Sequence, residues 1–280
     1  MNRTLRRYFP IFLVPTFVAF VVGFVIPFLV GMYLSFCKFT TVTDSRFVGL
    51  DNYKYIFSDG TFLHSLWYTA LFTVVAVVSI NVIAFTIALF LTKKIRGTNI
   101  FRTVFFMPNL IGGIVLGYIW QLIFNGILLY FDKTLTFSAS YGFFGLLILL
   151  NWQQIGYMMI IYIAGIQNIP PDVLEAAKID GATDLQILRK VTIPMVMPSI
   201  TISVFLTLTN SFKLFDQNLA LTAGEPSGKS EMLALNIYNT FYGRAGFEGV
   251  GQAKAVIFFL IVAALALVQL YVTKRKEVQA

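Results

Sequence analysis

Long apolar stretches alternate with short polar segments along the whole chain. Six of these stretches reach the roughly 20 residues that a helix needs to cross the hydrocarbon core of a bilayer. They cover residues 9–36, 63–91, 104–124, 143–166, 195–215 and 253–272. We therefore predict six membrane-spanning helices. Pro15, Pro27 and Pro108 are compatible with them, because neighbouring helices can satisfy the carbonyl groups that a proline leaves free.

The first apolar stretch follows three arginines, as the core of a secretory signal would. It is much longer than the 7–15 apolar residues that are usual there, and it lacks a clear small-residue cleavage site. We expect it to be retained as a helix.

Composition supports the membrane prediction and narrows the chemistry. The 280 residues are 58% hydrophobic and 12% charged, against roughly 45–50% and 25% in soluble domains. Cys37 and His64 are single residues of their types, which excludes an internal disulfide and most metal or nucleophile–base sites. We expect no enzyme activity and no metal site, and we interpret His64 as a polar residue near a membrane interface.

The net charge of +8 is interpreted through topology. If the N-terminus is cytoplasmic, 13 Lys and Arg residues lie on the inner side and 7 on the outer side, with Lys213 inside the fifth span. This bias predicts that both termini are cytoplasmic, and it does not imply nucleic acid as a partner. The inner residues are Arg3, Arg6, Arg7, Lys93, Lys94, Arg96, Arg102, Lys178, Arg189, Lys190, Lys274, Arg275 and Lys276. The outer ones are Lys38, Arg46, Lys54, Lys133, Lys229, Arg244 and Lys254.

The segment TAGEPSGKS, residues 222–230, ends like a phosphate-binding loop, G-x-x-x-x-G-K-[ST]. The first glycine of that pattern would fall on Ala223, and Gly224 comes one position too late. An apolar helix precedes the segment where a phosphate loop needs a strand. We interpret the segment as an outer turn rich in Gly, Pro and Ser.

The connection between the fourth and fifth spans, residues 168–198, carries its own helix signals. Pro170 and Pro171 suit a first helical turn, and acidic residues follow them. Asp180 and Gly181 end this helix, and Thr183 with Gln186 fits a capping box that begins a second one. We predict two short helices on the cytoplasmic side. Their small apolar surface either docks on a soluble partner or packs on the chain's own bundle.

The motif EAAKIDGA followed by VTIP resembles the EAA loop of binding-protein-dependent ABC importer permeases. Its residues are Glu175, Ala176, Ala177, Asp180, Gly181, Val191, Ile193 and Pro194. In that family the loop forms a coupling helix that sits in a cleft of the ATPase subunit. The stretches FVGLDNY, FRTVFFMPN, LFDQNLALTAGEP and NIYNTFY narrow the resemblance to the carbohydrate permeases related to the maltose permease.

The resemblance implies a complete molecular setting. The fold would be an all-α polytopic membrane protein, a single domain over 1–280 with the six helices of the ABC type I importer permease. The chain would be a permease subunit in a prokaryotic cell membrane that passes on a sugar or oligosaccharide. Its partners would be a second permease subunit, an ABC ATPase dimer and an extracellular sugar-binding protein. The chain itself would hold no cofactor, because the partner ATPase subunits use ATP and Mg²⁺.

Polar and aromatic residues in the spans are candidates for the solute site. Lys213 and Asp216 would share a helical face and either pair with each other or bind sugar hydroxyls, with Asn210 one turn away. Trp152 and Tyr157 would stack on a sugar ring or pack in an aromatic belt. The resemblance places the pocket at Asn109, Gly113, Trp152, Gln153, Tyr157, Lys213 and Asp216.

Three other functions remain open. An ABC permease for a non-sugar solute shares the EAA loop, although the first outer loop and the LFDQNLALT phrase favour sugar. An ion-coupled secondary transporter would often show internal repeats and would leave the EAA loop unexplained. A membrane enzyme lacks a cluster of candidate catalytic groups. ATPase activity that depends on added partner subunits would separate the two permeases from the other two classes.

Overall fold

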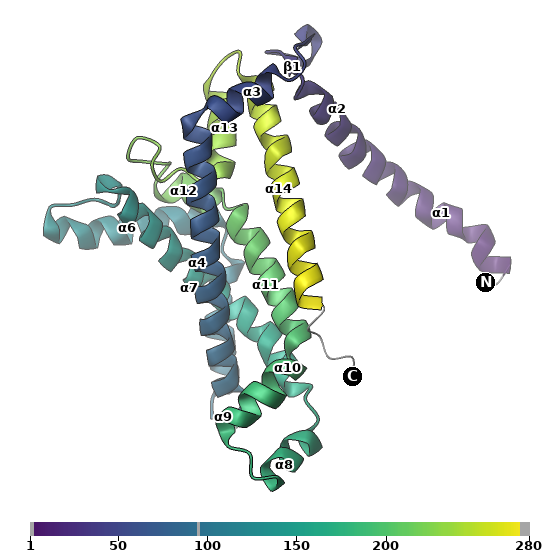
Figure 1. Ribbon diagram of the computed structural model, residues 1–280, viewed down its shortest axis with the longest axis vertical. Helices are drawn as coiled ribbons and strands as arrows, with labels where there is room; N and C mark the ends of the chain where they lie inside the picture. Colours follow the sequence, from purple (N-terminus) through teal and green to yellow (C-terminus); the bar gives the residue numbers. More distant parts are fainter. Residues whose placement is uncertain (1–2, 94–95, 275–280) are drawn as a thin grey trace. The chain divides into compact units, whose positions relative to one another are not determined.

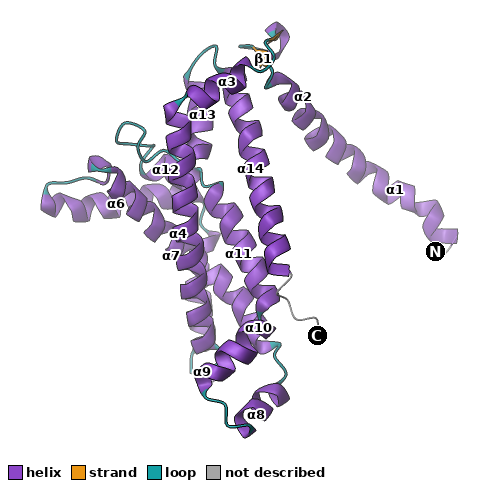
Figure 2. Ribbon diagram, in the orientation of Figure 1, coloured by secondary structure: helices purple, strands orange, loops and turns teal. Residues whose placement is uncertain are grey.

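The computed structural model describes residues 3–93 and 96–274, which are mostly helical (Figures 1 and 2). Five helical segments are long and apolar enough to cross a membrane. A sixth is obtained when Asp184–Met195 and Met197–Phe212, which meet at a 70° bend, count as one span. The predicted set of six spans corresponds to this count. Lys94, Arg275 and Lys276, which we predicted to lie on the inner side, fall outside the described residues.

The contacts divide the chain into two compact units, which we describe separately. One unit comprises Met1–Gly60 and Ile237–Phe259, and the other comprises Thr61–Asn236 and Leu260–Ala280. That the chain acts as a single domain stays a prediction.

The first unit contains the first span and the segment that follows it. Helix α1 (Arg3–Phe20), the π-helical η1 (Val21–Val25) and α2 (Ile26–Leu34) form the span, followed by β1 (Cys37–Lys38), η2 (Val42–Asp44), β2 (Arg46–Phe47) and α3 (Asp51–Ser58). The part of α13 (Leu233–Gly243) from Ile237 onward and the first turns of α14 (Glu248–Lys274) complete this unit. The antiparallel pairing of β1 with β2 is a small departure from the all-α prediction.

The FVGLDNY stretch has a structural explanation within this unit. Gly49 has a φ of +62°, which a side chain would strain. The buried Asn52 donates two hydrogen bonds of 2.9 Å, to the carbonyls of Ser35 and Cys37. The stretch therefore closes the strand pair onto the end of the first span.

The second unit holds the remaining helices and the main hydrophobic core. Buried side chains of α4 and α7 dominate this core, among them Phe72, Ile80, Leu146 and Met158. The elements are α4 (Gly60–Leu91), α5 (Thr98–Phe106), η3 (Met107–Leu110), α6 (Gly113–Leu128), η4 (Leu129–Phe131), η5 (Leu135–Phe137), α7 (Ala139–Gln167), α8 (Pro171–Ile179), α9 (Asp184–Ile187), η6 (Leu188–Thr192), α10 (Ile193–Met195), α11 (Met197–Phe212) and α12 (Asp216–Leu221).

Hydrogen bonds between buried and half-buried polar groups connect α4, α7 and α11 inside the second unit. The Tyr162 hydroxyl donates to Asn81 Oδ1 at 2.5 Å, and Asn81 Nδ2 donates to Thr207 Oγ1 at 2.9 Å. Asn151 Nδ2 donates to Ser79 Oγ at 3.0 Å. Interhelical hydrogen bonds of this kind help to hold apolar membrane helices together, where lipid and side chain are equally apolar.

The predicted third span, 104–124, is wrong in its first part. Helix α5 ends at Phe106, η3 follows, and the extended residue Ile111 separates η3 from α6. The segment able to span a membrane is Gly113–Phe131. Pro108 lacks an N–H group, and Gly112 follows the extended residue, so the helix stops and restarts here.

Two π-helical turns each end two residues before a proline. In η1 the Ile26 N–H bonds the Val21 carbonyl, and Pro27 follows. In η6 the Ile193 N–H bonds the Leu188 carbonyl, and Pro194 follows. Because proline has no N–H to continue the α-helical pattern, the last donor reaches back five residues.

Residues 222–230 form a turn, as predicted, and follow the short helix α12. The Ser230 side chain donates to the Glu225 carbonyl at 2.6 Å, and the Ser230 N–H donates to the Gly224 carbonyl at 3.2 Å. The exposed His64 ring contacts the Lys229 carbonyl at 3.0 Å. The Gly-Lys-Ser sequence is therefore part of a loop that binds its own backbone.

Candidate coupling segment and solute pocket

The connection between α7 and α11 folds as two short helices, as predicted. Pro171 begins α8, and the helix ends in a Schellman motif. The Gly181 N–H bonds the Lys178 carbonyl, and the Ala182 N–H bonds the Ala177 carbonyl, each at 3.0 Å. Gly181 has a φ of +77°, the left-handed conformation that this motif needs. The fold of the helix end therefore depends on glycine at position 181.

The second helix of the connection begins with the predicted capping box. The Thr183 N–H donates to Gln186 Oε1 at 2.8 Å, and the Gln186 N–H donates back to Thr183 Oγ1 at 3.4 Å. After η6 the chain enters α10 at Ile193, with Pro194 in its first turn, and bends into α11. The Glu-Ala-Ala helix is thus connected through α9 and α10 to the fifth span.

The helix pair α8–α9 exposes apolar side chains. Ile179 is 85% exposed, and Val173 and Leu185 are also exposed. Glu175, Ala176 and Asp180 are exposed as well, and Ala177 is half-buried. Within the second unit the pair projects beyond the ends of α4 and α7 (Figure 1). Of the two sequence interpretations, docking on a soluble partner suits this surface better than packing on the bundle.

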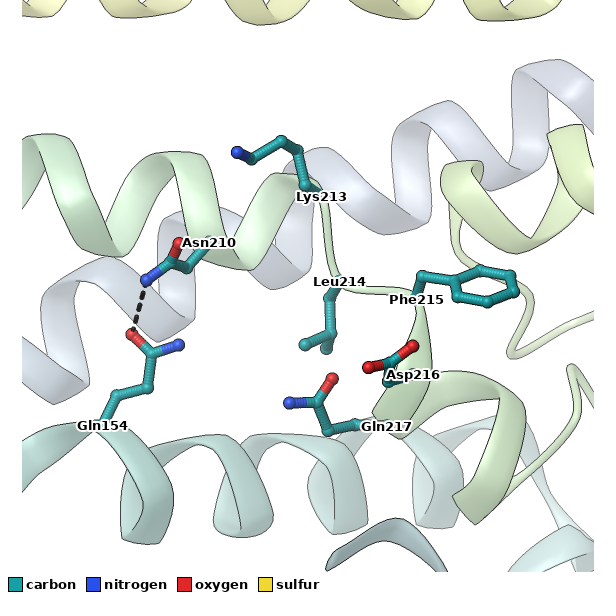
Figure 3. Close-up of a pocket in the computed structure, with 7 residues that line it drawn as sticks. All are labelled: Gln154, Asn210, Lys213, Leu214, Phe215, Asp216 and Gln217. Carbon is teal, nitrogen blue, oxygen red and sulfur yellow. Dashed lines mark hydrogen bonds between the residues drawn. The ribbon is translucent and has the colours of Figure 1, made fainter. Parts of the chain in front are cut away.

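A second feature is a polar pocket of about 460 Å³ at the junction of α11 and α12. Helix α11 ends at Phe212, and α12 begins at Asp216, so the connecting residues turn away from the helix axis. Figure 3 shows the side chains around the pocket. They are Gln154 from α7, Asn210 from α11, Asp216 and Gln217 from α12, and Lys213, Leu214 and Phe215 from the connection.

Asn210, Lys213 and Asp216 line this pocket, and their role in binding a solute stays a prediction. The prediction that Lys213 and Asp216 share a helical face is wrong, because the helix break separates them. In the described part of the chain no ion pair joins them, and Lys213 points away from Asp216 (Figure 3). Asn210 Nδ2 instead donates to Gln154 Oε1 at 3.3 Å. Both charged side chains are exposed and available to a solute.

The other predicted pocket residues are not among those that line this pocket. The Trp152 ring packs edge-on against Trp120 at 5.5 Å, and the Tyr157 ring packs against Phe106 at 6.3 Å. The half-buried Asn109 lies in η3. Gln153 accepts a hydrogen bond from the pocket residue Gln217, and Gly113 lies close to Asp216 and Gln217. The substrate roles of these five residues stay predictions.

Sequence reasoning missed Gln154, Gln217, Leu214 and Phe215. Gln154 is the neighbour of Gln153, and Gln217 is the neighbour of Asp216, both of which the sequence analysis selected. The interpretation from helical periodicity treated the fifth span as one unbroken helix. The break between Phe212 and Asp216 changes which side chains face the pocket.

Comparison with known proteins places the chain among transport components. The family model described as "Binding-protein-dependent transport system inner membrane component" matches residues 84–278. The probable starch degradation products transport system permease protein of Thermoanaerobacterium thermosulfurigenes is 43% identical, over 96% of this chain and 94% of that protein. The multiple sugar-binding transport system permease protein of Streptococcus mutans is 30% identical, over 99% of each.

The fold also has a counterpart among solved structures. A chain of a bacterial ABC transporter involved in the import of the acidic polysaccharide alginate superposes with a TM-score of 0.83. The match covers 98% of both chains at 17% sequence identity. At this identity the likeness concerns the fold alone.

Proposed function

Since the chain belongs to the family of inner membrane components of binding-protein-dependent transport systems, we propose that it imports a sugar or oligosaccharide. The chain is the permease subunit of an ATP-driven importer and receives its solute from an extracellular binding protein. The observation that carries the proposal is the exposed helix pair α8–α9 between the fourth and fifth spans. Family membership makes the chain a transport component of the membrane and not an enzyme.

The coupling segment transmits the work of the ATPase. Closure of a partner ATPase dimer, which binds ATP and Mg²⁺, moves α8 through its contacts around Glu175, Ala176, Ala177 and Asp180. The Schellman end at Gly181 and the bend after Pro194 carry this movement into α11. Nucleotide binding shifts the equilibrium between inward-facing and outward-facing states only if the partner contacts α8 differently in the two states.

The pocket chemistry supports a polyhydroxylated solute. Three side-chain amides, one carboxylate and one ammonium group line it together with Phe215. Such groups donate and accept hydrogen bonds to hydroxyls, and an aromatic face suits the apolar face of a sugar ring. The relatives named for starch degradation products and multiple sugars point the same way. An ABC permease for a non-sugar solute is the second candidate.

The orientation follows from the charge bias, with both termini and the coupling segment cytoplasmic. Within the second unit, the C-terminal ends of α4 and α7 lie toward the end of α8 and α9 (Figure 1). Lys93 follows α4, and Arg189 and Lys190 lie in η6. The complete importer contains a second permease subunit, a different chain in this proposal, beside the ATPase dimer and the binding protein.

The proposal is tested by purifying the assembled complex from membranes, wild type against Glu175→Ala combined with Gly181→Leu. Co-purifying ATPase and sugar-stimulated ATP hydrolysis are measured. We expect the ATPase with wild type and loss of coupling in the double variant. Lys229→Ala, an exposed change in the turn that follows α12, is the control. We expect this variant to keep both the bound ATPase and the sugar-stimulated ATP hydrolysis. Absence of an ATPase, with transport intact in the double variant, would instead favour a secondary transporter.

A further inference from the structure

The buried side-chain amide of Gln153 makes hydrogen bonds through both its nitrogen and its oxygen. Its side chain is 7% exposed. Gln153 Nε2 donates to the Ile111 carbonyl at 3.2 Å, and Gln153 Oε1 accepts from Gln217 Nε2 at 2.8 Å. This amide therefore connects the break between η3 and α6 with a side chain that lines the pocket.

The direction of these two hydrogen bonds is set by the broken backbone. Ile111 is extended and lies outside both helices, and a carbonyl at such a break needs a donor in an apolar environment. Because the carbonyl only accepts, Gln153 must present its NH₂ group to it and its oxygen to Gln217. Gln217 must then donate through Nε2, which leaves Gln217 Oε1 as the free end of the amide.

Gln217 Oε1 is an acceptor available to a solute. Gln217 lines the pocket and is partly exposed, and no hydrogen bond to its Oε1 is found within the described ranges. In Figure 3 its oxygen lies on the side of Asp216. The pocket therefore presents two acceptors next to each other on α12.

The second support of α12 is its close approach to α6. A Cβ atom at Gly113 would lie 2.8 Å from Asp216 Cβ and 2.9 Å from Gln217 Cδ, too close for either. One turn later, a Cβ atom at Gly117 would lie 2.5 Å from Ala220 Cβ. The start of α12 thus rests directly on the backbone of α6, as small-xxx-small contacts allow in membranes.

We propose that Gln217 determines solute specificity by accepting a hydrogen bond from a sugar hydroxyl through Oε1, and that Gln153 and Gly113 are its positioning residues. Gln153 sets which end of the Gln217 amide faces the solute, and Gly113 sets where α12 begins. This inference rests on the proposed import of a sugar.

The test uses the complete complex in proteoliposomes, with its binding protein and radiolabelled maltotriose. Import rates give the concentration for half-maximal transport, KM, and the maximal rate. We expect Gln217→Leu and Gln153→Leu each to raise KM by about tenfold, the order of one lost hydrogen bond. The variant with both changes should be no worse than either alone, because both remove the same interaction.

Gln121→Leu is the matched control. Gln121 Nε2 also donates to a backbone carbonyl of α12, that of Leu221, at 3.0 Å, but Gln121 does not line the pocket. If Gln153, like Gln121, only supports α12, then Gln153→Leu and Gln121→Leu lower the yield of assembled complex equally. We expect Gln121→Leu to lower the yield without raising KM.

Several outcomes would overturn the inference. A wild-type KM in Gln153→Leu makes Gln153 a purely structural residue, and additive effects of the two changes exclude the relay. If Gln153→Leu does not assemble, Gln217→Met decides, because it keeps the approximate size of Gln217 but has no amide oxygen to accept a hydrogen bond from the solute, and an unchanged KM refutes the proposal. A wild-type complex that hydrolyses ATP but imports no sugar refutes the proposed function itself, and this inference with it.

Discussion

At the scale of single residues, Lys254 is the most unusual charge in the chain. It is 1% exposed at the start of α14, where its Nζ lies 2.9 Å from Asp59 Oδ2 and donates to Thr240 Oγ1 at 2.9 Å. Two charges removed from water are tolerated when they are paired and hydrogen-bonded. Our sequence analysis treated Lys254 only as an outer-side positive charge, because burial is not visible in the pattern.

We expect Lys254→Met to destabilise the protein by about 3–5 kcal/mol, because it removes the ammonium group that neutralises the buried Asp59 carboxylate. The double change with Asp59→Leu should recover most of this loss, since no buried charge remains. Thermal unfolding of the purified protein in detergent measures both.

Lys54→Met is the control for this prediction. The Lys54–Asp51 ion pair is 3.1 Å long, and its side chains are 76% and 69% exposed. Water and salt screen such a pair, so we expect a change of about 0–1 kcal/mol. Equal effects of Lys254→Met and Lys54→Met would refute the special role of the buried pair.

At the scale of elements, the helices meet most closely at glycines. Gly156 of α7 faces the end of α5, where a Cβ atom would overlap the Phe105 carbonyl group. Helix α5 therefore packs against α7 backbone to backbone. This contact positions the segment that leads into η3 and the break at Ile111. Because Gln153 bonds both the Ile111 carbonyl and the pocket residue Gln217, the contact also affects the pocket.

We expect Gly156→Ala to force α5 away from α7 and to destabilise the protein by at least about 1–3 kcal/mol, the usual cost of overpacking. The measurement is the melting temperature, together with the amount of assembled complex recovered from membranes. Gly126→Ala in α6 is the control, because nothing lies within 4 Å of the added methyl group. A Gly156→Ala protein as stable as Gly126→Ala would show that α5 does not hold this position in solution.

At the scale of the whole molecule, the positive residues predict the topology in the membrane, and two exposed residues can test it. Tyr130 after α6 is 89% exposed and lies in a predicted outer loop, and Ile179 at the end of α8 is 85% exposed and lies in the coupling segment. The two are separated by α7 in the sequence. Cys37 is the chain's single cysteine and is buried, so single introduced cysteines can report on each side.

We expect Tyr130→Cys in a Cys37→Ala background to react with a membrane-impermeant maleimide in intact cells. Ile179→Cys in the same background should react only after the membrane is opened. Labelling of the Cys37→Ala parent gives the background. Reaction of Ile179→Cys in intact cells would reverse the orientation that the Lys and Arg bias predicts.

The sequence by itself determined the number of spans, the two short helices between the fourth and fifth spans, and the resemblance that led to the family. These features depend on signals within a few neighbouring residues: apolar runs, a proline at a helix start, a glycine at a helix end and a capping box. Such signals act through the local backbone, so they can be detected without knowing what the helix packs against.

Only the tertiary structure decided which polar groups meet. The break at Ile111, the turn between α11 and α12, and the burial of Lys254 and Gln153 depend on residues far apart in the chain. Glycine contacts such as Gly113 on α12 set the distance between elements, and a single sequence does not record them. Hydrogen-bond direction, set by the Ile111 carbonyl, then determines which atom of Gln217 remains free in the pocket.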